Sequence, residues 1–350
     1  MARSHCIYGG TGTRKTTQVK WFSRYIAEVT GKATLLLSSD GGGWGPCQPE
    51  VDAGMIVPFF CDPSFVPLPT IRKISQGYWP RDVNVSAGEV DLVPINWNEY
   101  GAVAIEGWTS ISSIGMRYLP DKGINVGGED RTKLGGFEQT IQVGGRVVAE
   151  QLRSNTRGDF GFIQNFVFGI VMNFNSLPCR DVLYTALESK TEDDDRSTVF
   201  GPAIAGKKAT AQCGSWVGDL IHAQDYPVEV VQKVPNPAKP SESIEQKVID
   251  MAVRFYFKKH LDPATSIPFP AKPRVSPERV KELERKFPGG YFESDAEGGL
   301  DRYLREVDRL TAEAAAHDSL KDWRAKADAR LGRVTAGPAA SVAAKLSPIK

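Results

Sequence analysis

A glycine-rich stretch near the start of the chain carries the residue types best suited to chemistry. A short apolar run enters Gly9-Gly10-Thr11-Gly12-Thr13-Arg14-Lys15-Thr16-Thr17, and a predicted helix follows. This layout matches the phosphate-binding P-loop, G-x-x-x-x-G-K-[ST], in which backbone N–H groups and a helix N-terminus surround the phosphates of a nucleotide. The nine residues are therefore predicted to bind a nucleotide, with Lys15 on its β- and γ-phosphates and the Thr16 hydroxyl on Mg²⁺.

Arg14 departs from the motif, because it stands where the motif has its second glycine. Glycine at this place lets the backbone approach the phosphates and adopt unusual φ and ψ angles. An arginine would either shift the loop or add a cation beside the nucleotide or a neighbouring acid. The alternative for the whole stretch is a glycine-rich hairpin followed by a basic helix start.

Two other apolar runs end in acidic side chains. The run that begins at Ala33 leads through two serines to Asp40, and residues 100–105 lead to Glu106. In a Walker B strand an acid at the strand end helps to hold Mg²⁺, so Glu106 is predicted as a metal ligand together with Thr16. The alternative is a strand that merely ends in a solvated acid.

The elements around these residues predict an α/β fold. A strand at 5–9, the loop, a helix from about 16 to 30 and a strand at 33–40 form a βαβ unit, which requires a parallel sheet. In such sheets chemistry gathers at the carboxyl ends of the strands. Further helices are predicted at 68–77, 146–152 and 160–175, and another ends near residue 222.

The order of domains is predicted from changes in composition. Residues 1–234 form the α/β domain, the proline-rich segment 235–243 is a linker, 244–335 is a helical appendage, and 336–350 is a disordered tail. Within the appendage, apolar spacing predicts a helix at 244–259. Helices from about 276 to 287 and from 299 to about 334 follow.

Bulk composition excludes several classes of protein. With 43 basic and 42 acidic residues the net charge is +1, so any binding of nucleic acid must come from a local patch. The five scattered cysteines without C-x-x-C spacing indicate reduced thiols, a cytoplasmic location and no structural zinc site. Polar residues interrupt the longest apolar stretch, 160–174, so no membrane span is expected.

Taken together, residues 5–234 resemble the RecA-like P-loop ATPases encoded by bacteriophages, including the single-strand annealing and recombination ATPases. The segments that carry the resemblance are 9–17, the strands ending at Asp40 and Glu106, Gly201-Pro202, and Gly206-Lys207-Lys208. The resemblance implies a RecA-like core with a mainly parallel sheet flanked by helices, with ATP and Mg²⁺ as its ligands. It also implies a homo-oligomer in the cytoplasm of a host cell, or one associated with a virion.

The resemblance also implies roles for single residues. The strand after the P-loop helix of these enzymes ends in an acid that orients the attacking water, and Asp40 matches that place. The strand after the Walker B strand carries a polar residue that senses the γ-phosphate, and Thr185 or Glu188 matches it. Lysines further along reach the nucleotide of a neighbouring subunit, a role that Lys207 or Lys208 would take. The implied catalytic set is Lys15, Asp40, Glu106, Glu188, Lys207 and Lys208.

Three functions compete. The first is a recombination ATPase that assembles on single-stranded DNA, with basic residues of the 120–158 loops on the phosphates, although acidic residues lie among them. The second is an assembly or virion-associated protein with weak or no ATPase activity, whose segment 241–350 docks on a protein partner. The third, a packaging-motor ATPase, is disfavoured because no nuclease-like acidic cluster follows the core.

Overall fold

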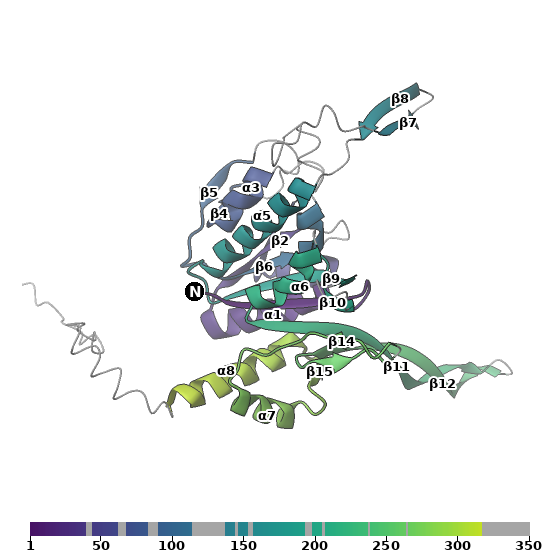
Figure 1. The fold of residues 1–350 in the computed structure, drawn as a ribbon. Coiled ribbons are helices and arrows are strands. Elements are labelled where there is room, and N and C mark those ends of the chain that lie inside the picture. Colours follow the sequence, from purple (N-terminus) through teal and green to yellow (C-terminus); the bar gives the residue numbers. More distant parts are fainter. Residues whose placement is uncertain are drawn as a thin grey trace, which may run out of the picture.

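The computed structural model describes residues 1–39, 44–61, 68–82, 90–113, 137–143, 146–152, 157–192, 198–204, 207–236, 239–263 and 265–316. Within these ranges a nine-stranded sheet forms the centre of the molecule (Figure 1). Its order is β15-β12-β11-β1-β9-β6-β2-β3, and β10 pairs with β9. The strands are β1 Arg3–Gly9, β2 Ala33–Ser38, β3 Ile56–Phe60, β6 Tyr100–Glu106, β9 Asp181–Glu192, β10 Thr198–Pro202, β11 Asp219–Asn236, β12 Lys239–Tyr256 and β15 Tyr291–Glu293.

The sheet is parallel from β3 through β11, and β10, β12 and β15 add antiparallel edges. The other described strands form three smaller two-stranded sheets. They are β4 Tyr78–Pro80 with β5 Leu92–Pro94, β7 Phe137–Val143 with β8 Arg146–Leu152, and β13 His260–Leu261 with β14 Pro268–Phe269. The predicted α/β fold with a mainly parallel sheet flanked by helices is confirmed.

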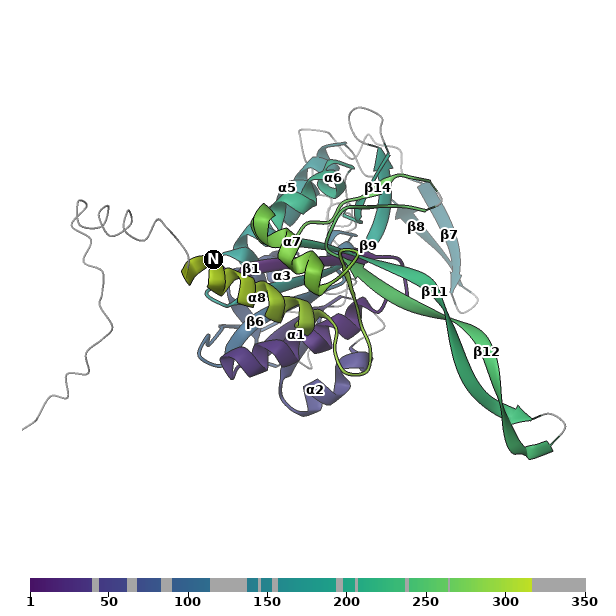
Figure 2. The same cartoon turned by 90° about the horizontal axis from the view of Figure 1, so that it is seen from below.

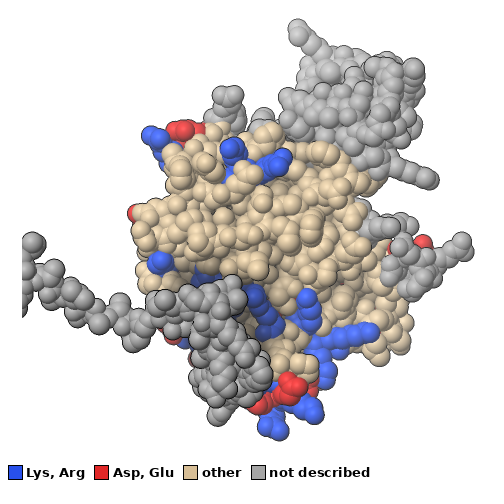
Figure 3. All heavy atoms as spheres, turned by 60° about the vertical axis from the view of Figure 1, so that its left-hand side comes forward, with Lys and Arg blue, Asp and Glu red and all other residues tan. Residues whose placement is uncertain are grey.

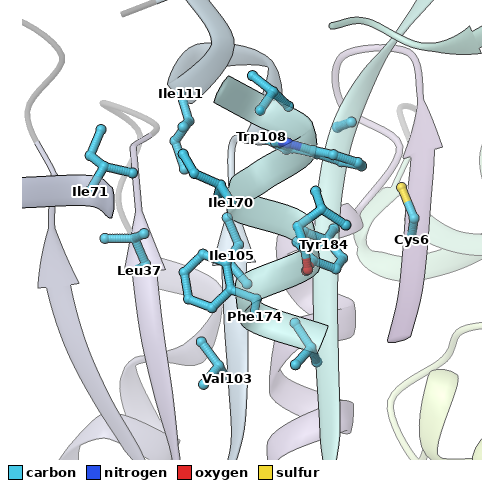
Figure 4. Close-up of a cluster of buried hydrophobic side chains, with 14 of the residues drawn as sticks. Cys6, Leu37, Ile71, Val103, Ile105, Trp108, Ile111, Ile170, Phe174 and Tyr184 are labelled. Atoms are coloured by element: carbon cyan, nitrogen blue, oxygen red, sulfur yellow. The ribbon is translucent and has the colours of Figure 1, made fainter. Parts of the chain in front are cut away.

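Helices cover both faces of the sheet (Figure 1). On one face pack α3 (Leu68–Ser75), α5 (Arg157–Asn175) and α6 (Lys207–Trp216), around a core that contains Trp108, Tyr184 and Phe174 (Figure 4). The other face is covered by α1 (Lys15–Thr30), α7 (Pro277–Lys286) and α8 (Leu300–Ala316). A short 3-10 helix at Gly45–Cys47 and α2 (Gln48–Asp52) lie beside α1. The sheet is therefore buried on both sides, as its continuous apolar strands require.

Several predicted elements are correct. The first predicted helix is α1, whose Val19, Phe22 and Ile26 are fully buried at helical spacing. It ends at Gly31, which adopts a φ of 67° and donates its N–H to the carbonyl of Ala27. The helices predicted at 68–77, 160–175 and from residue 276 correspond to α3, α5 and α7, and the one from residue 299 is α8 as far as residue 316.

Two predicted helices are wrong, because their residues belong to strands, in which successive side chains alternate between the two faces of a sheet. Residues 244–259 are not a helix, because they belong mostly to β12, in which Val253 and Phe255 point inward with at most 3 % exposure, and Phe257 just after the strand continues this alternation. Residues 146–152 form β8 rather than a helix. The segment 235–243 is not a linker between domains, because its described residues end β11 and begin β12. β12, β15 and α8 share a buried core with α1, so the described part of 244–335 is not a separate helical appendage.

The predicted helix that ends near residue 222 is too long. It corresponds to α6, which ends at Trp216, and β11 begins at Asp219. Residues 120–136 and 317–350, which include the predicted tail, lie outside the described residues. Among the described helices, none combines the length and the apolar character needed to cross a bilayer. Within the described residues, none of the five cysteines forms a disulfide.

A buried network of charges joins the amino ends of the central strands to α8. His5 of β1 bonds to Asp219 of β11 through Nδ1 (2.6 Å) and to Asp181 of β9 through Nε2 (3.0 Å), and all three side chains are fully buried. Arg3 donates to both oxygens of Asp181, at 2.6 and 2.9 Å, and also to Asp308 of α8. Because these groups come from three strands and one helix, the network fixes α8 against the sheet, alongside α1 (Figure 2).

Candidate nucleotide-binding site

The predicted P-loop lies between β1 and α1, at the carboxyl edge of the parallel strands. Gly9 ends β1 in a place with no room for a side chain, because a Cβ there would lie 2.2 Å from the carbonyl oxygen of Ala223. Gly12 adopts a φ of 83°, which an L residue rarely reaches. The loop then enters α1 directly, so the helix N-terminus faces the space beyond the strands.

Arg14 adopts the left-handed conformation, with φ 53° and ψ 29°. Among the described residues other than glycine, only Ser266 shares a positive φ. This geometry is the one for which the motif uses glycine, so Arg14 accepts backbone strain to keep the loop in shape. The loop is therefore closed in the P-loop manner despite the departure in sequence.

Replacing Arg14 with glycine is expected to raise the free energy of unfolding by up to about 1 kcal/mol. A left-handed conformation costs an L residue about 1–2 kcal/mol, and glycine removes that cost. Glycine also loses more conformational entropy on folding, which offsets about 0.5–1 kcal/mol of the gain in stability. Urea unfolding of Arg14→Gly would measure the difference. Arg14→Ala is the matched control, because it removes the same charge but keeps the Cβ. Equal stability of the two variants would contradict backbone strain at Arg14, because only glycine relieves it.

Lys15 lies across the loop that precedes it. Its ammonium group donates to the carbonyl oxygens of Gly9 (3.0 Å) and Gly10 (2.5 Å) and to the Thr13 hydroxyl (3.0 Å). The Thr13 hydroxyl in turn donates to the Gly10 carbonyl at 2.8 Å. The charge of Lys15 is thus held at the centre of the loop, where the phosphates of a nucleotide would need it.

The two predicted metal ligands meet at one point. The Thr16 hydroxyl donates to Oε1 of Glu106, and the Ser38 hydroxyl donates to Oε2 at 3.0 Å. Only 2 % of Glu106 is exposed, so the alternative of a solvated acid at the strand end is wrong. A hydroxyl and a carboxylate oxygen side by side suit Mg²⁺, which takes one or two protein ligands and completes its octahedron with phosphate and water. The described residues hold no group of three or more His, Cys, Asp or Glu side chains able to bind a metal.

The two candidate sensors at the end of β9 differ in what they contact. Thr185 is 3 % exposed, and its Oγ1 accepts the N–H of Gly107 at 3.2 Å, just after the Walker B strand. Glu188 lies beyond it, and its Oε2 accepts a bond of 2.6 Å from Nε2 of His222. Thr185 thus ties two strand ends together, whereas Glu188 is 25 % exposed at the edge.

Two histidines at this edge were not anticipated. His222 of β11 is buried (1 %), and its Nδ1 lies 3.0 Å from Nε2 of His260 in β13. Burial lowers the pKa of His222, although the adjacent Glu188 opposes that effect. Burial and the neighbouring His222 lower the pKa of His260 to about 4. No signal in the sequence pointed to them, because residues 219–223 are buried on both faces of the strand and show no alternation of polar and apolar residues.

The side-chain placement of the remaining predicted site residues is outside what the structure describes. Asp40 lies outside the described residues. Lys207 and Lys208 begin α6, and their side chains lie outside what the structure describes. Their proposed roles therefore stay predictions.

Comparison with known proteins adds little to this geometry. No protein-family model and no curated protein sequence matches the chain. Among solved structures, the chain is similar to the RadB recombinase (10 % identity, TM-score 0.33), with 76 % of this chain and 84 % of that one covered. It is also similar to the KaiC-like protein PH0186 from Pyrococcus horikoshii OT3 (12 % identity, TM-score 0.30), with 77 % and 89 % covered. At these TM-scores the functional assignment rests on the P-loop and its neighbours alone.

Proposed function

We propose that this chain binds ATP with Mg²⁺ at the P-loop and hydrolyses it, as a RecA-like ATPase of DNA recombination or DNA metabolism. The observation that carries the proposal is the contact between the Thr16 hydroxyl and the buried Glu106 carboxylate. It joins the end of the P-loop to the end of a separate strand, at the place where Mg²⁺ would bridge protein and phosphates. A glycine-rich hairpin without a nucleotide has no need of this arrangement.

The residues divide the work of phosphoryl transfer, which needs positioning and charge neutralisation more than covalent chemistry. The N–H groups of the loop and the start of α1 bind the phosphates, and Lys15 offsets their negative charge. Mg²⁺, when bound, would neutralise charge on the β- and γ-phosphates, with Thr16 and Glu106 as its protein ligands. Lys207 and Lys208 keep the roles that the resemblance implies and act on the nucleotide of a neighbouring subunit.

We propose single-stranded DNA as the polymer on which an oligomer of this chain acts. Most of the basic residues that are assigned to DNA contact lie outside the described residues. The charges that the structure describes therefore bear only on the body of the molecule. On the face shown in Figure 3, lysine and arginine side chains gather in separate groups with uncharged surface between them. DNA contact is therefore assigned to the 120–158 loops rather than to a basic track over the body.

A titration with a fluorescent ATP analogue tests the proposal. Wild-type protein is expected to bind the analogue in the presence of Mg²⁺, and Lys15→Ala to weaken binding at least 10-fold by removing the charge at the centre of the loop. Lys20→Ala is the matched control, since Lys20 is a partly exposed lysine one turn further along α1. Absence of binding by the wild-type protein would refute the enzymatic function.

One observation favours the second function, a nucleotide-binding assembly protein. β11 and β12 extend as a two-stranded ribbon away from the body (Figures 1 and 2). Val231, Ile249 and Met251 share one face of this ribbon and are 60 %, 76 % and 49 % exposed. The ion pair of Lys247 with Glu229 lies on the same face, at 3.1 Å. Exposed apolar side chains beside such a pair on a projecting ribbon suit contact with a second copy of the chain. Sedimentation and ATPase assays with and without single-stranded DNA separate the two functions, because assembly without DNA-stimulated turnover favours the second.

A further inference from the structure

Three ionisable side chains form a row beside the P-loop. Glu188 comes from β9, His222 from β11 and His260 from β13. His222 contacts both others, with 2.6 Å from its Nε2 to Oε2 of Glu188 and 3.0 Å from its Nδ1 to Nε2 of His260. Nothing in the P-loop motif requires these histidines, so the row needs an explanation of its own.

The sheet register places the row next to the nucleotide site. Gly9, where the P-loop begins, pairs with Leu187 of β9 on one side and with Ala223 of β11 on the other. Glu188 is therefore one residue beyond the end of β1, and His222 lies opposite Tyr8. The charge of Lys15 contributes to lowering the pKa of His222, which indicates that the P-loop cation and the row are close.

Aromatic packing holds both imidazoles in place. His222 stacks on Phe269 with ring centres 3.9 Å apart, and His260 stacks on Tyr256 at 3.7 Å. Tyr8 packs against the other edge of His222, with its ring centre at 4.9 Å. With the rings fixed, the direction in which His222 donates depends only on where its proton sits.

Glu188 determines that position. The lowered pKa values leave both imidazoles neutral near pH 7. A neutral His222 can bond to the Glu188 carboxylate only by donating from Nε2, which leaves its Nδ1 as an acceptor. His260 has its Nε2 3.0 Å from that nitrogen and its Nδ1 3.3 Å from the carbonyl oxygen of Lys258, and with a single N–H it donates to one of the two. Its ring also stacks on His222, so in either tautomer it holds the imidazole of His222 in place.

We propose that Glu188 is the carboxylate that orients the water attacking the γ-phosphate, and that His222, held by His260, is its positioning residue. This assignment rests on the proposed ATPase function and gives Glu188 the role that the sequence assigned to Asp40. His222 binds one carboxylate oxygen, and 25 % of the Glu188 side chain is exposed, so water reaches it.

The step balances without another reactant. The water oxygen forms a bond to the γ-phosphorus, and the bond from that phosphorus to the bridging oxygen breaks, with its electron pair leaving on ADP. The proton released from the water passes to the Glu188 carboxylate and then to solvent. His222 keeps its proton throughout and holds the carboxylate in place.

The test compares turnover with nucleotide affinity. Glu188→Gln is expected to lower kcat by about 10²-fold or more. His222→Leu, which removes the donor, is expected to lower kcat by about 10–100-fold, and both variants should keep the affinity for a fluorescent ATP analogue within about twofold. His222→Gln restores an N–H near the position of Nε2 and should recover most of the loss. Groups whose charge acts on His222, and so on any pH profile, are Glu188, Asp262, Lys15 and His260.

Several results would overturn the assignment. Unchanged turnover in Glu188→Gln, or equal losses in His222→Leu and His222→Gln, would each do so, as would loss of activity in Asp40→Asn but not in Glu188→Gln. Thermal unfolding of each variant separates a folding defect from a catalytic one, and Glu188→Gln, at a partly exposed site, stays informative if the variants of buried His222 fail to fold. A wild-type protein that neither binds nor hydrolyses ATP would instead refute the proposed function.

Discussion

Replacing Glu106 with glutamine is expected to lower the rate of ATP hydrolysis by about 10²-fold or more and to raise the Mg²⁺ concentration needed for activity. The carboxylate accepts hydrogen bonds from Thr16 and Ser38 and is almost fully buried, so its charge is little screened by water. Glutamine keeps the size of the side chain and one accepting oxygen, but it removes the negative charge that a divalent cation requires. Phosphate release measured across a Mg²⁺ titration would show the effect.

Ser38→Ala provides the control for this experiment. It removes one hydrogen bond to Glu106 but leaves the carboxylate charge, so its effect on turnover should be below about tenfold. A Glu106→Gln variant with the same Mg²⁺ dependence as the wild-type protein would contradict the metal-binding role. Glu106 would then be only a buried hydrogen-bond partner of Thr16.

The second large effect is expected at the opposite end of the strands. Asp181→Asn should lower the free energy of unfolding by about 3–5 kcal/mol, because it removes the buried carboxylate that His5 and Arg3 share and leaves each of them with one acidic partner, Asp219 or Asp308. The Asp181 carboxylate accepts hydrogen bonds from His5 and from two nitrogens of Arg3, and it is fully buried. Asparagine matches its shape, so the loss would report charge rather than packing. Urea unfolding near pH 6 would measure it.

The pH dependence of stability gives this experiment a second readout. Burial favours the neutral form of Asp181, but His5 and Arg3 outweigh it and hold its pKa below the ordinary range. Burial likewise opposes the charge on His5, and its bonds to Asp181 and Asp219 still raise its pKa. The contribution of Asp181 is therefore present above about pH 4 and falls as acid protonates it. The contribution of His5 is complete below about pH 6.5 and falls as the pH rises through its raised pKa.

Asp295→Asn is the matched control for Asp181→Asn. Asp295 pairs with Arg302 at 2.8 Å, but its side chain is 54 % exposed, so solvent screens the pair and its removal should change stability little. Equal losses in the two variants would show that burial of the Asp181 network does not strengthen it.

The positions of the glycine-rich loop and of Glu106 in the fold could be predicted better than the edges of the sheet. Gly9, Lys15, Thr16 and Glu106 follow local rules, since a loop that binds phosphate needs fixed spacing and a βαβ unit needs its strands in parallel. Their meeting point could therefore be expected, even though Glu106 lies 90 residues beyond Thr16. Likewise, the strain at Arg14 follows from the motif that it interrupts.

The strand β12 shows why the rest could not be predicted in the same way. Ile244, Val248, Met251 and Phe255 recur at the spacing of a helix. Every second residue from Ile249 to Phe257, which lies just after the strand, is also apolar, as in a strand. Both periods fit the same residues, and only pairing with β11 decides between them. The error spread to His222 and His260, because a histidine gains a role only from the strands that bring it to Glu188.

The packing of the C-terminal segments on α1 sets the limits of any shortened form of the protein. A fragment that ends at residue 234 would contain the P-loop and Glu106 but would lack Phe255, Tyr303 and Leu310, which are fully buried in one core with Phe22 of α1. Such a fragment would lose α7 and α8, would leave α1 as the main cover of one face of the sheet, and would remove Asp308 from Arg3. The smallest unit that keeps this face covered therefore extends at least to Leu310, some 300 residues beyond the phosphate-binding loop that it supports.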